Sequence, residues 1–362
     1  MKSLERSSGT SNTSGNLQKR YEARGFLMLI SVQYLRGLAA VLVLIHHAIH
    51  KQGQLSGSGG EWQFGVSGVD LFFIISGFIM CHITARRETT ARDFLWARFK
   101  RIIPLYWTLT LAALAVYIVS PDMVNSSGGT TTIINSFTLI PTGDVFLIQN
   151  GWTLSYEFLF YLVFAMSLWI GRDWRLSAVA AALVAMVALG ALLKPGDPTL
   201  QALTGQLLLE FVMGIGAYRY INQLQHSRAL DVGLFITGIA TLVIGLFINH
   251  VGNRVLWYGL PYALLFAGFV SLDAVVARAG VGLISRVLKK IGDASYSIYL
   301  SHPFVFSGMG VVIRKSHLHM APSLSIAVMA VTAVCAGYAC HEMLELKLER
   351  WIRSLFSSPT LA

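Results

Sequence analysis

Long apolar stretches alternate with short polar segments along most of the chain. Ten of these stretches approach the roughly 20 residues that an α-helix needs to cross a membrane. They cover residues 31–49, 66–84, 102–119, 150–170, 176–193, 201–219, 231–249, 255–273, 294–313 and 322–341. Because unpaired backbone is not tolerated in lipid, the pattern predicts an all-α fold, a polytopic transmembrane helical bundle of about ten spans.

The composition excludes a soluble globular protein. The chain is 54% hydrophobic and only 13% charged, with a mean hydropathy of +0.60, whereas soluble domains carry roughly 25% charged residues. The net charge of +10 does not indicate nucleic-acid binding, because the basic residues lie in short loops between apolar stretches. There they orient the protein and meet anionic lipid or anionic ligands.

The distribution of Lys and Arg predicts the orientation. Of the 28 basic residues, 22 fall in the segments on one side of the expected spans, five fall on the other side, and Arg36 lies within a span. The positive-inside rule therefore places both termini in the cytoplasm. Residues 1–25 are polar and basic without a signal-peptide cleavage pattern, so we expect a disordered cytoplasmic tail there and a second cytoplasmic tail over 346–362.

The first apolar stretch carries ionisable residues that a lipid-facing helix would avoid. Arg36 lies near one end, and His46, His47 and His50 lie near the other. Arg36 and His47 are eleven residues apart, which is about 16 Å along a helix. Ionisable groups at membrane depth usually face a bundle interior or a watery cavity, so this span is a candidate functional element.

A basic loop separates the second and third spans. It contains Arg86, Arg87, Arg92, Arg98, Lys100 and Arg101. Positive-inside anchoring explains such a loop without further function. Alternatively, Arg98 and Arg101 share one helix face, and their guanidinium groups suit the oxygens of a cytosolic phosphate-bearing ligand.

Two acidic residues in other spans extend the candidate site. Asp70 begins the second span at its outer end, as an interfacial residue or as a partner that approaches His47 if the first two helices pair. Glu157 lies about two turns into the fourth span, either pairing with Arg36 or acting as a carboxylate in a polar cavity. Trp152 marks the outer interface of that span and is a candidate substrate contact.

The ninth span is rich in hydroxyl groups. Tyr296, Ser297 and His302 either bond between helices or contact a substrate, and Pro303 favours a kink beside them. Glu210 in the sixth span has no evident partner and stays unassigned. The three cysteines lie in or at the ends of apolar stretches and show no pairing or metal-binding pattern.

Five blocks in order along residues 33–303 resemble the membrane acyltransferase family 3, most closely its exopolysaccharide-acetylating branch. They are QYLRGLAAVLVLIHH, FGVSGVDLFFIISGFIM, RFKRIIPLYW, NGWTLSYEFLFYL and GDASYSIYLSHP. The resemblance implies an acyltransferase domain over 26–345. It also implies transfer of an acetyl group from cytosolic acetyl-CoA to a saccharide hydroxyl. The polar N-terminal tail and the His46-His47 doublet depart from the family pattern.

The resemblance also assigns roles to matching residues. His47 corresponds to the family's essential histidine and Arg36 to its paired arginine. Arg98 and Arg101 correspond to the motif proposed to hold the CoA phosphates, and Glu157 to the fourth-span acid. His47 then acts either as a general base toward the acceptor hydroxyl or as a covalent acyl relay.

The leading hypothesis is an inner-membrane O-acetyltransferase that modifies an exopolysaccharide or lipid-linked glycan, acting with polysaccharide-synthesis machinery. Acyl-CoA is its donor substrate, and no permanently bound cofactor or metal is expected. The alternative is a transporter or flippase for glycans, in which the intramembrane Arg, His and Glu residues form a proton or substrate pathway. A receptor or scaffold would give no reason for burying Arg36 and His47.

Overall fold

The structure is a computed structural model that describes residues 29–57, 62–86, 88–124, 130–247, 253–280, 282–316 and 320–356. The predicted tail over 1–25 lies outside these residues. The described part is almost entirely helical, and its only strand-like feature is one isolated bridge between Thr131 and Val145. The predicted all-α class is therefore confirmed.

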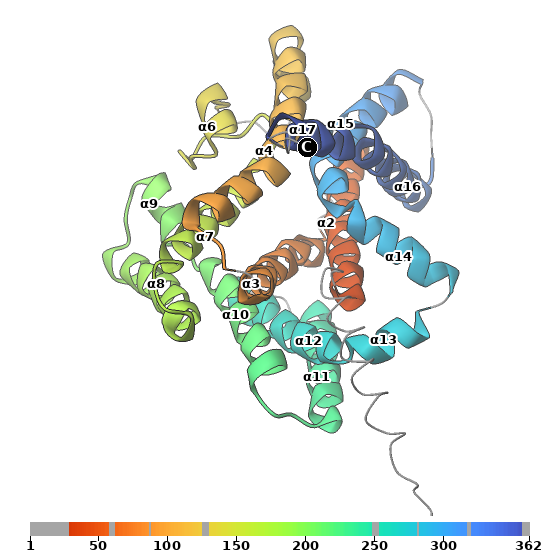
Figure 1. Cartoon of the computed structure of the whole chain (residues 1–362). Coiled ribbons are helices and arrows are strands. Elements are labelled where there is room, and N and C mark those ends of the chain that lie inside the picture. The colour runs from red at the N-terminus through yellow and green to blue at the C-terminus, as the bar shows by residue number, and fades with distance from the viewer. Residues whose placement is uncertain are drawn as a thin grey trace, which may run out of the picture.

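Ten longer helices carry most of the chain (Figure 1). They are α2 (Ile30–Ser56), α3 (Gly68–Arg86), α4 (Ala91–Val119), α7 (Gly151–Ser167), α8 (Arg172–Leu193), α10 (Leu208–Gln223), α11 (Arg228–Phe247), α12 (Leu260–Ser271), α15 (Ser295–Ser316) and α16 (Pro322–Cys340). Shorter elements connect and extend them. These are η2 (Gln63–Ser67), α5 (Pro121–Val124), α6 (Ile133–Thr138), α9 (Pro198–Leu203), η3 (Val255–Gly259), α13 (Asp273–Ala279), α14 (Leu283–Asp293), η4 (His341–Glu345) and α17 (Leu346–Phe356).

Within the described ranges, eight helices are long and apolar enough to cross a membrane. A ninth span results if Val255–Ser271 and Asp273–Ala279, which meet at a bend of 68°, are counted together. The chain is therefore a multi-pass membrane protein. Helix α7 has 17 residues, at the lower limit of spanning length, so the count of ten stays a prediction.

Helix α3 lies in the interior, between α2 and α10 (Figure 1). Two glycines allow this close packing. A Cβ atom on Gly68 would lie 2.4 Å from the Ala39 carbonyl oxygen of α2, and one on Gly77 would lie 2.3 Å from the Phe211 carbonyl oxygen of α10. Small residues at such crossings let helix backbones approach in a membrane. Side chains from α2 and α3 therefore share one interior.

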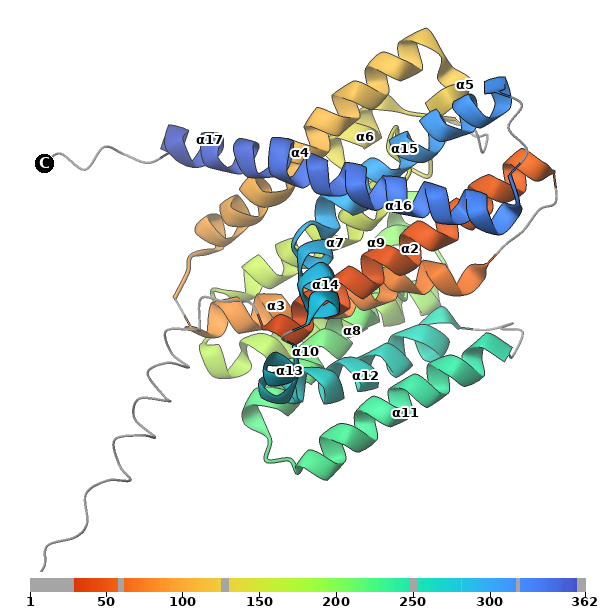
Figure 2. The same ribbon diagram turned by 90° about the vertical axis from the view of Figure 1, so that its right-hand side faces the viewer.

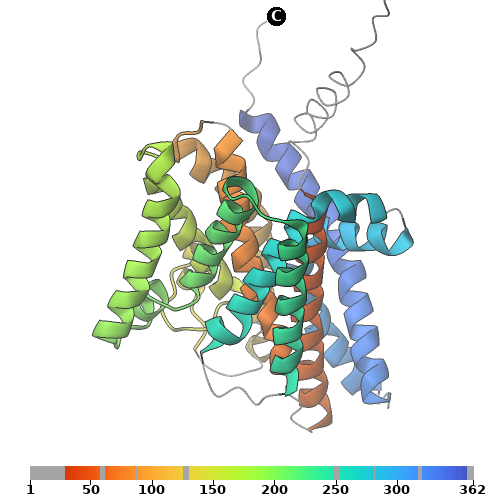
Figure 3. The same cartoon turned by 90° about the horizontal axis from the view of Figure 1, so that it is seen from below.

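Helix α2 begins at the same end of the bundle at which α17 ends (Figure 2). The first turn of α2 is held there by α13, because Asp273 accepts hydrogen bonds from the Ser31 backbone nitrogen at 2.8 Å and from the Ser31 hydroxyl at 2.6 Å. Helices α13 and α14 lie across this end of the bundle (Figures 1 and 3). This end is the one that the Lys and Arg distribution assigns to the cytoplasm.

The segment between α4 and α7 is folded in its described part, residues 130–150. Asp144 accepts hydrogen bonds from the hydroxyl groups of Thr130 at 2.6 Å, Thr132 at 2.5 Å and Thr142 at 3.1 Å. These bonds lower the pKa of the Asp144 carboxyl, since they stabilise its charged form. The sequence predicts this segment to be an outer loop.

Candidate active site

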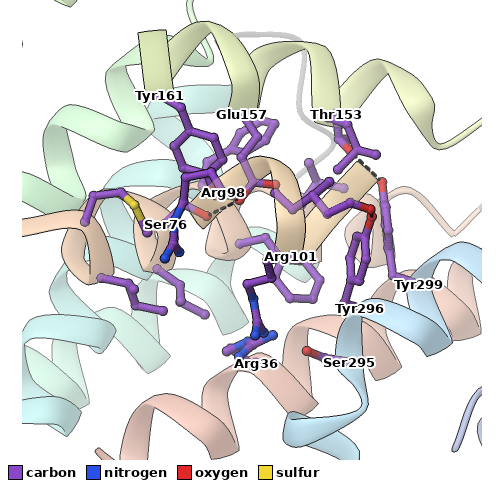
Figure 4. Close-up of a pocket in the computed structure, with 18 of the residues that line it drawn as sticks. Arg36, Ser76, Arg98, Arg101, Thr153, Glu157, Tyr161, Ser295, Tyr296 and Tyr299 are labelled. Carbon is purple, nitrogen blue, oxygen red and sulfur yellow. Dashed lines mark hydrogen bonds between the residues drawn. The ribbon is translucent and has the colours of Figure 1, made fainter. Parts of the chain in front are cut away.

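A cavity of about 470 Å³ opens between α2, α3, α4, α7 and α15. Its walls combine apolar side chains from α3 with three arginines, one carboxylate and several hydroxyl groups (Figure 4). The polar residues are Arg36, Ser76, Arg98, Arg101, Thr153, Glu157, Tyr161, Ser295, Tyr296 and Tyr299. A mostly apolar pocket with a few convergent polar groups is typical of a small-molecule site.

The arginines give the cavity an excess of positive charge. Arg36, on α2, is buried, and its side chain approaches that of Arg101, from α4 (Figure 4). The Nε of Arg98 is buried without a hydrogen-bond partner, and in the described part of the chain no carboxylate lies within ion-pair distance of any of the three. Arg36 is buried and Arg98 and Arg101 are half-buried, so three cations facing one space favour an anionic ligand.

Glu157 is the only carboxylate among the residues that line the cavity. It accepts a hydrogen bond from Ser76 at 3.1 Å and another from the Tyr161 hydroxyl (Figure 4). These bonds fix the carboxylate between α3 and α7, near the arginines rather than paired with one of them. The ion pair with Arg36 considered for Glu157 is not found among the described residues, and its role as a proton acceptor stays a prediction.

His47 does not line the cavity. Its ring is half-buried and stands 5.1 Å from the ring of His302 on α15, measured between ring centroids. His302 is buried, and its Nδ1 lies 3.2 Å from the Ile298 carbonyl oxygen. That oxygen can only accept, so Nδ1 donates to it, and the Nε2 atom has no hydrogen-bond partner among the described residues.

Tyr299 connects the two regions. It lines the cavity and its ring centroid lies 6.1 Å from that of His302. Its hydroxyl lies 2.9 Å from that of Thr153, and its carbonyl oxygen accepts a bond from Asn150 at 2.7 Å. A row of rings, Tyr299, His302 and His47, therefore leads from the cavity toward the expected outer half of the bundle. Tyr299 was not among the predicted site residues.

The other predicted substrate contacts lie in different surroundings. Tyr296 lines the cavity and donates to the Ile102 carbonyl oxygen at 2.8 Å. Ser297 faces away from the cavity and donates to Glu345 at 2.6 Å, a carboxylate that also lies 2.7 Å from His341 Nδ1. Trp152 packs against Tyr156. Arg86 is the last residue of α3, and the structure describes its backbone only. Arg87 lies outside the described residues.

The expected approach of Asp70 to His47 is wrong. Asp70 is fully buried and pairs with Arg254, whose Nε donates to Oδ1 at 2.9 Å and whose Nη2 donates to Oδ2 at 2.7 Å. Because Arg254 offers a full positive charge and two donors, it is a better partner for a buried carboxylate than a neutral imidazole. Asp70 thus belongs to a structural ion pair.

Glu210, left unassigned by the sequence, joins this ion pair. It is fully buried near Asp70 and Arg254, and neither of its carboxyl oxygens has a hydrogen-bond partner in the described part of the chain. Among the described residues Arg254 forms its ion pair with Asp70, so Glu210 is a second buried carboxyl group beside a single cation.

Comparison with known proteins identifies the family. A family model described as "Acyltransferase domain" matches residues 29–342, and this range covers the cavity, His47 and the Asp70 cluster. The chain belongs to the acyltransferase 3 family. It is an acyltransferase and, with its apolar helices, a membrane enzyme.

This acyltransferase is similar to several named proteins. It is 34% identical to the exopolysaccharide production protein ExoZ of Rhizobium meliloti (strain 1021), over 85% of this chain and 95% of that protein. It is 26% identical to the acyltransferase MdmB of Streptomyces mycarofaciens, over 88% and 90%, and 28% identical to nodulation protein 10 of Rhizobium leguminosarum bv. viciae, over 75% and 81%. No solved structure matches the acyltransferase.

Proposed function

We propose that the protein transfers an acetyl group, or a related acyl group, from cytosolic acyl-CoA to a hydroxyl of an exopolysaccharide or lipid-linked glycan in the inner membrane. The observation that carries the donor assignment is the cavity with three arginines and one carboxylate. CoA bears its phosphates at the nucleotide end and its thioester at the tip of a long flexible arm. Arg36, Arg98 and Arg101 would bind the phosphates while the arm carries the thioester deeper into the bundle.

The similarity to ExoZ, named as an exopolysaccharide production protein, supports a saccharide acceptor. His47 lies about 16 Å along α2 from Arg36, beyond the cavity and toward the expected outer face. A saccharide hydroxyl approaching from that side would meet the His47 ring, and the thioester would arrive from the opposite side past Tyr299 and His302.

The reaction then requires one proton transfer in each direction. The His47 imidazole takes the acceptor proton as the hydroxyl oxygen attacks the thioester carbonyl carbon. The carbon–sulfur bond breaks, and the imidazolium returns the proton to the departing thiolate. The alternative, a transient acyl group on His47, also conserves atoms and charge, and differs in forming an acyl-enzyme that is detectable by mass spectrometry after rapid quenching.

The arginine assignment is tested with purified protein in vesicles, by release of CoA thiol that depends on added acceptor glycan. Arg98→Ala or Arg101→Ala removes charge-assisted hydrogen bonds of about 1.5–3 kcal/mol each, so KM for acyl-CoA should rise by roughly 10- to 100-fold. Arg92→Ala is the matched control, because Arg92 lies exposed on the same helix outside the cavity. Equal effects at Arg92 and Arg98 would refute a phosphate site in the cavity.

The His47 assignment is tested in cells by NMR of the surface glycan, which reports both the acyl group and its position. His47→Ala should insert normally in the membrane and lower acylation by about 10² to 10⁴. His50→Ala should acylate normally, since His50 contacts the side chain of Gln54 on its own helix. Normal acylation with His47→Ala would remove His47 from the mechanism. Glycan movement in vesicles without thioester cleavage would instead favour the transporter.

A further inference from the structure

Helix α14 differs in direction from the spanning helices. It lies across the end of the bundle at which α2 begins and, with α13, projects to the side (Figures 1 and 3). One face packs on α2. The Ser285 hydroxyl is hydrogen-bonded to that of Tyr34, and a Cβ atom on Gly292 would lie only 2.0 Å from the Gln33 carbonyl oxygen. The helix is therefore attached mainly to α2, with smaller contacts to α15 and α16.

The two remaining strips of α14 are exposed and differ in chemistry. Leu283, Ile284 and Val287 form an apolar strip with exposed fractions of 70%, 77% and 45%. Because successive residues of an α-helix are rotated by about 100°, Arg286, Lys289 and Lys290 form a separate basic strip beside the apolar one. All three are exposed. Lys289 pairs with Asp293 at 2.6 Å and Lys290 lies 5.7 Å from the Tyr338 ring, so both stay partly engaged with the protein.

We propose that α14 lies in the headgroup layer of the cytoplasmic leaflet and binds anionic phospholipid, with its apolar strip among acyl chains and its basic strip on phosphates. An apolar strip beside a basic strip is the pattern of helices that lie in a membrane interface. The placement of α14 across the bundle end puts it at headgroup depth. A second copy of the chain fits less well, because two basic strips would repel each other.

Anchoring α14 would act on the donor cavity. Its contacts with α2 lie on both sides of Arg36: Gln33 and Tyr34 precede it, and Gly37 follows it, where a Cβ atom would lie 2.9 Å from the Leu288 carbonyl oxygen. Lipid bound to α14 thus holds the turn of α2 that points Arg36 into the cavity. This second step rests on the proposed function, whereas lipid binding does not.

Lipid binding is measured first, on the full-length protein in nanodiscs of phosphatidylcholine with or without phosphatidylglycerol. A spin label at Val287→Cys, in a chain with its three native cysteines replaced by alanine, should be relaxed by oxygen and shielded from an aqueous nickel reagent. A label at Arg286→Cys should be reached by the nickel reagent. If the nickel reagent reaches the label at Val287→Cys, the proposal is overturned. It is also overturned if that label is immobilised only at high protein density, because a second copy of the chain would then cover the helix.

The preference for anionic lipid is tested in the chain with its native cysteines. This experiment also tests lipid binding by α14 if the cysteine-free chain does not fold. A surface cation adds about 1 kcal/mol of attraction to anionic lipid, so the triple variant R286Q/K289Q/K290Q should retain at least about tenfold less phosphatidylglycerol by mass spectrometry. The control K194Q/R314Q/K315Q removes as many exposed cations from the opposite end of the bundle. Equal losses in both variants contradict a site on α14.

Acyl-CoA turnover in the same nanodiscs tests the effect on the cavity. Phosphatidylglycerol should stimulate the native chain and the control but not the α14 variant, with the difference in KM for acyl-CoA rather than in kcat. Stimulation that survives in the α14 variant overturns the link to Arg36. Absence of turnover in every lipid would refute the proposed function while leaving the spin-label and lipid-retention results to decide the lipid site.

Discussion

Arg254 shows how one residue can fix a buried charge. Its guanidinium is the cationic partner of the fully buried Asp70. Removing one partner of a buried ion pair leaves the other charge uncompensated, at a cost of about 3–5 kcal/mol. Arg254→Ala should therefore markedly lower the thermal unfolding temperature of the purified protein in detergent.

Two variants separate this effect from general charge loss. Lys315→Ala removes an exposed cation and should leave the unfolding temperature within a few degrees of the native value. Adding Asp70→Asn to Arg254→Ala should recover part of the loss, because the stranded charge is then gone. If the double variant is no more stable than Arg254→Ala alone, the ion pair is not what holds this region.

The sequence predicted those residues of the candidate site that stand out from their neighbours along the chain, but not the partners that tertiary structure brings to them. Arg36 stands out because an ionisable group in an apolar stretch needs a polar interior, and Arg98 and Arg101 stand out because they share one helix face in a basic loop; all three line the cavity. The partner of Asp70 lies 184 residues away in the sequence, at the start of a span where it resembles an ordinary loop cation. Only tertiary structure distinguishes such a pair from interfacial charges.

At the scale of elements, the packing of α3 on α10 positions one wall of the cavity. A Cβ atom on Gly214 of α10 would lie 2.2 Å from the Ile74 carbonyl oxygen of α3. That oxygen belongs to the backbone and cannot move without shifting α3. Gly214→Ala should cost about 1–3 kcal/mol of stability and lower the unfolding temperature.

The control lies on the same helix. Gly216 has no atom within 4 Å of its built Cβ position, so Gly216→Ala should be neutral or slightly stabilising, since alanine favours a helix over glycine. Similar losses in both variants would indicate a general sensitivity of α10 rather than a tight crossing with α3.

The boundaries of elements were less predictable than their existence. The apolar stretch over 201–219 predicts one span, and Pro198–Gln223 is one candidate span of the structure, but it contains a break at Gly205, between α9 and α10, that the sequence did not predict. Likewise, the chain turns by 68° between Val255–Ser271 and Asp273–Ala279. Hydropathy measures whether a segment suits lipid, and it is insensitive to helix breaks whose backbone groups find partners within the protein.

At the scale of the whole molecule, the charge asymmetry serves two purposes. The same excess of Lys and Arg that predicts orientation also supplies Arg98 and Arg101 to the cavity, at the end of the bundle expected to face the cytosol. His47 lies farther along α2. A donor entering from the basic end and an acceptor entering from the other would therefore meet within the bundle.

If the bent pair Val255–Ser271 and Asp273–Ala279 is counted as the ninth span, α7 decides whether the number of crossings is even. Its 17 residues give about 25 Å of helix against about 30 Å of hydrocarbon. The preceding residue Asn150 is buried and bonded to Tyr299 on α15, so protein rather than lipid surrounds the start of the helix. We therefore expect α7 to cross, and both termini to lie in the cytoplasm.

Single cysteines in a cysteine-free chain test this expectation with a membrane-impermeant maleimide on whole cells whose outer envelope is permeable to it. Thr142→Cys and Gly196→Cys should react directly, and Glu88→Cys and Ser354→Cys only after the inner membrane is opened; all four positions are exposed. If α7 does not cross, every later segment inverts. Gly196→Cys would then be protected and Ser354→Cys reactive, while Thr142→Cys and Glu88→Cys stay unchanged, which separates an error at α7 from an error in the overall orientation.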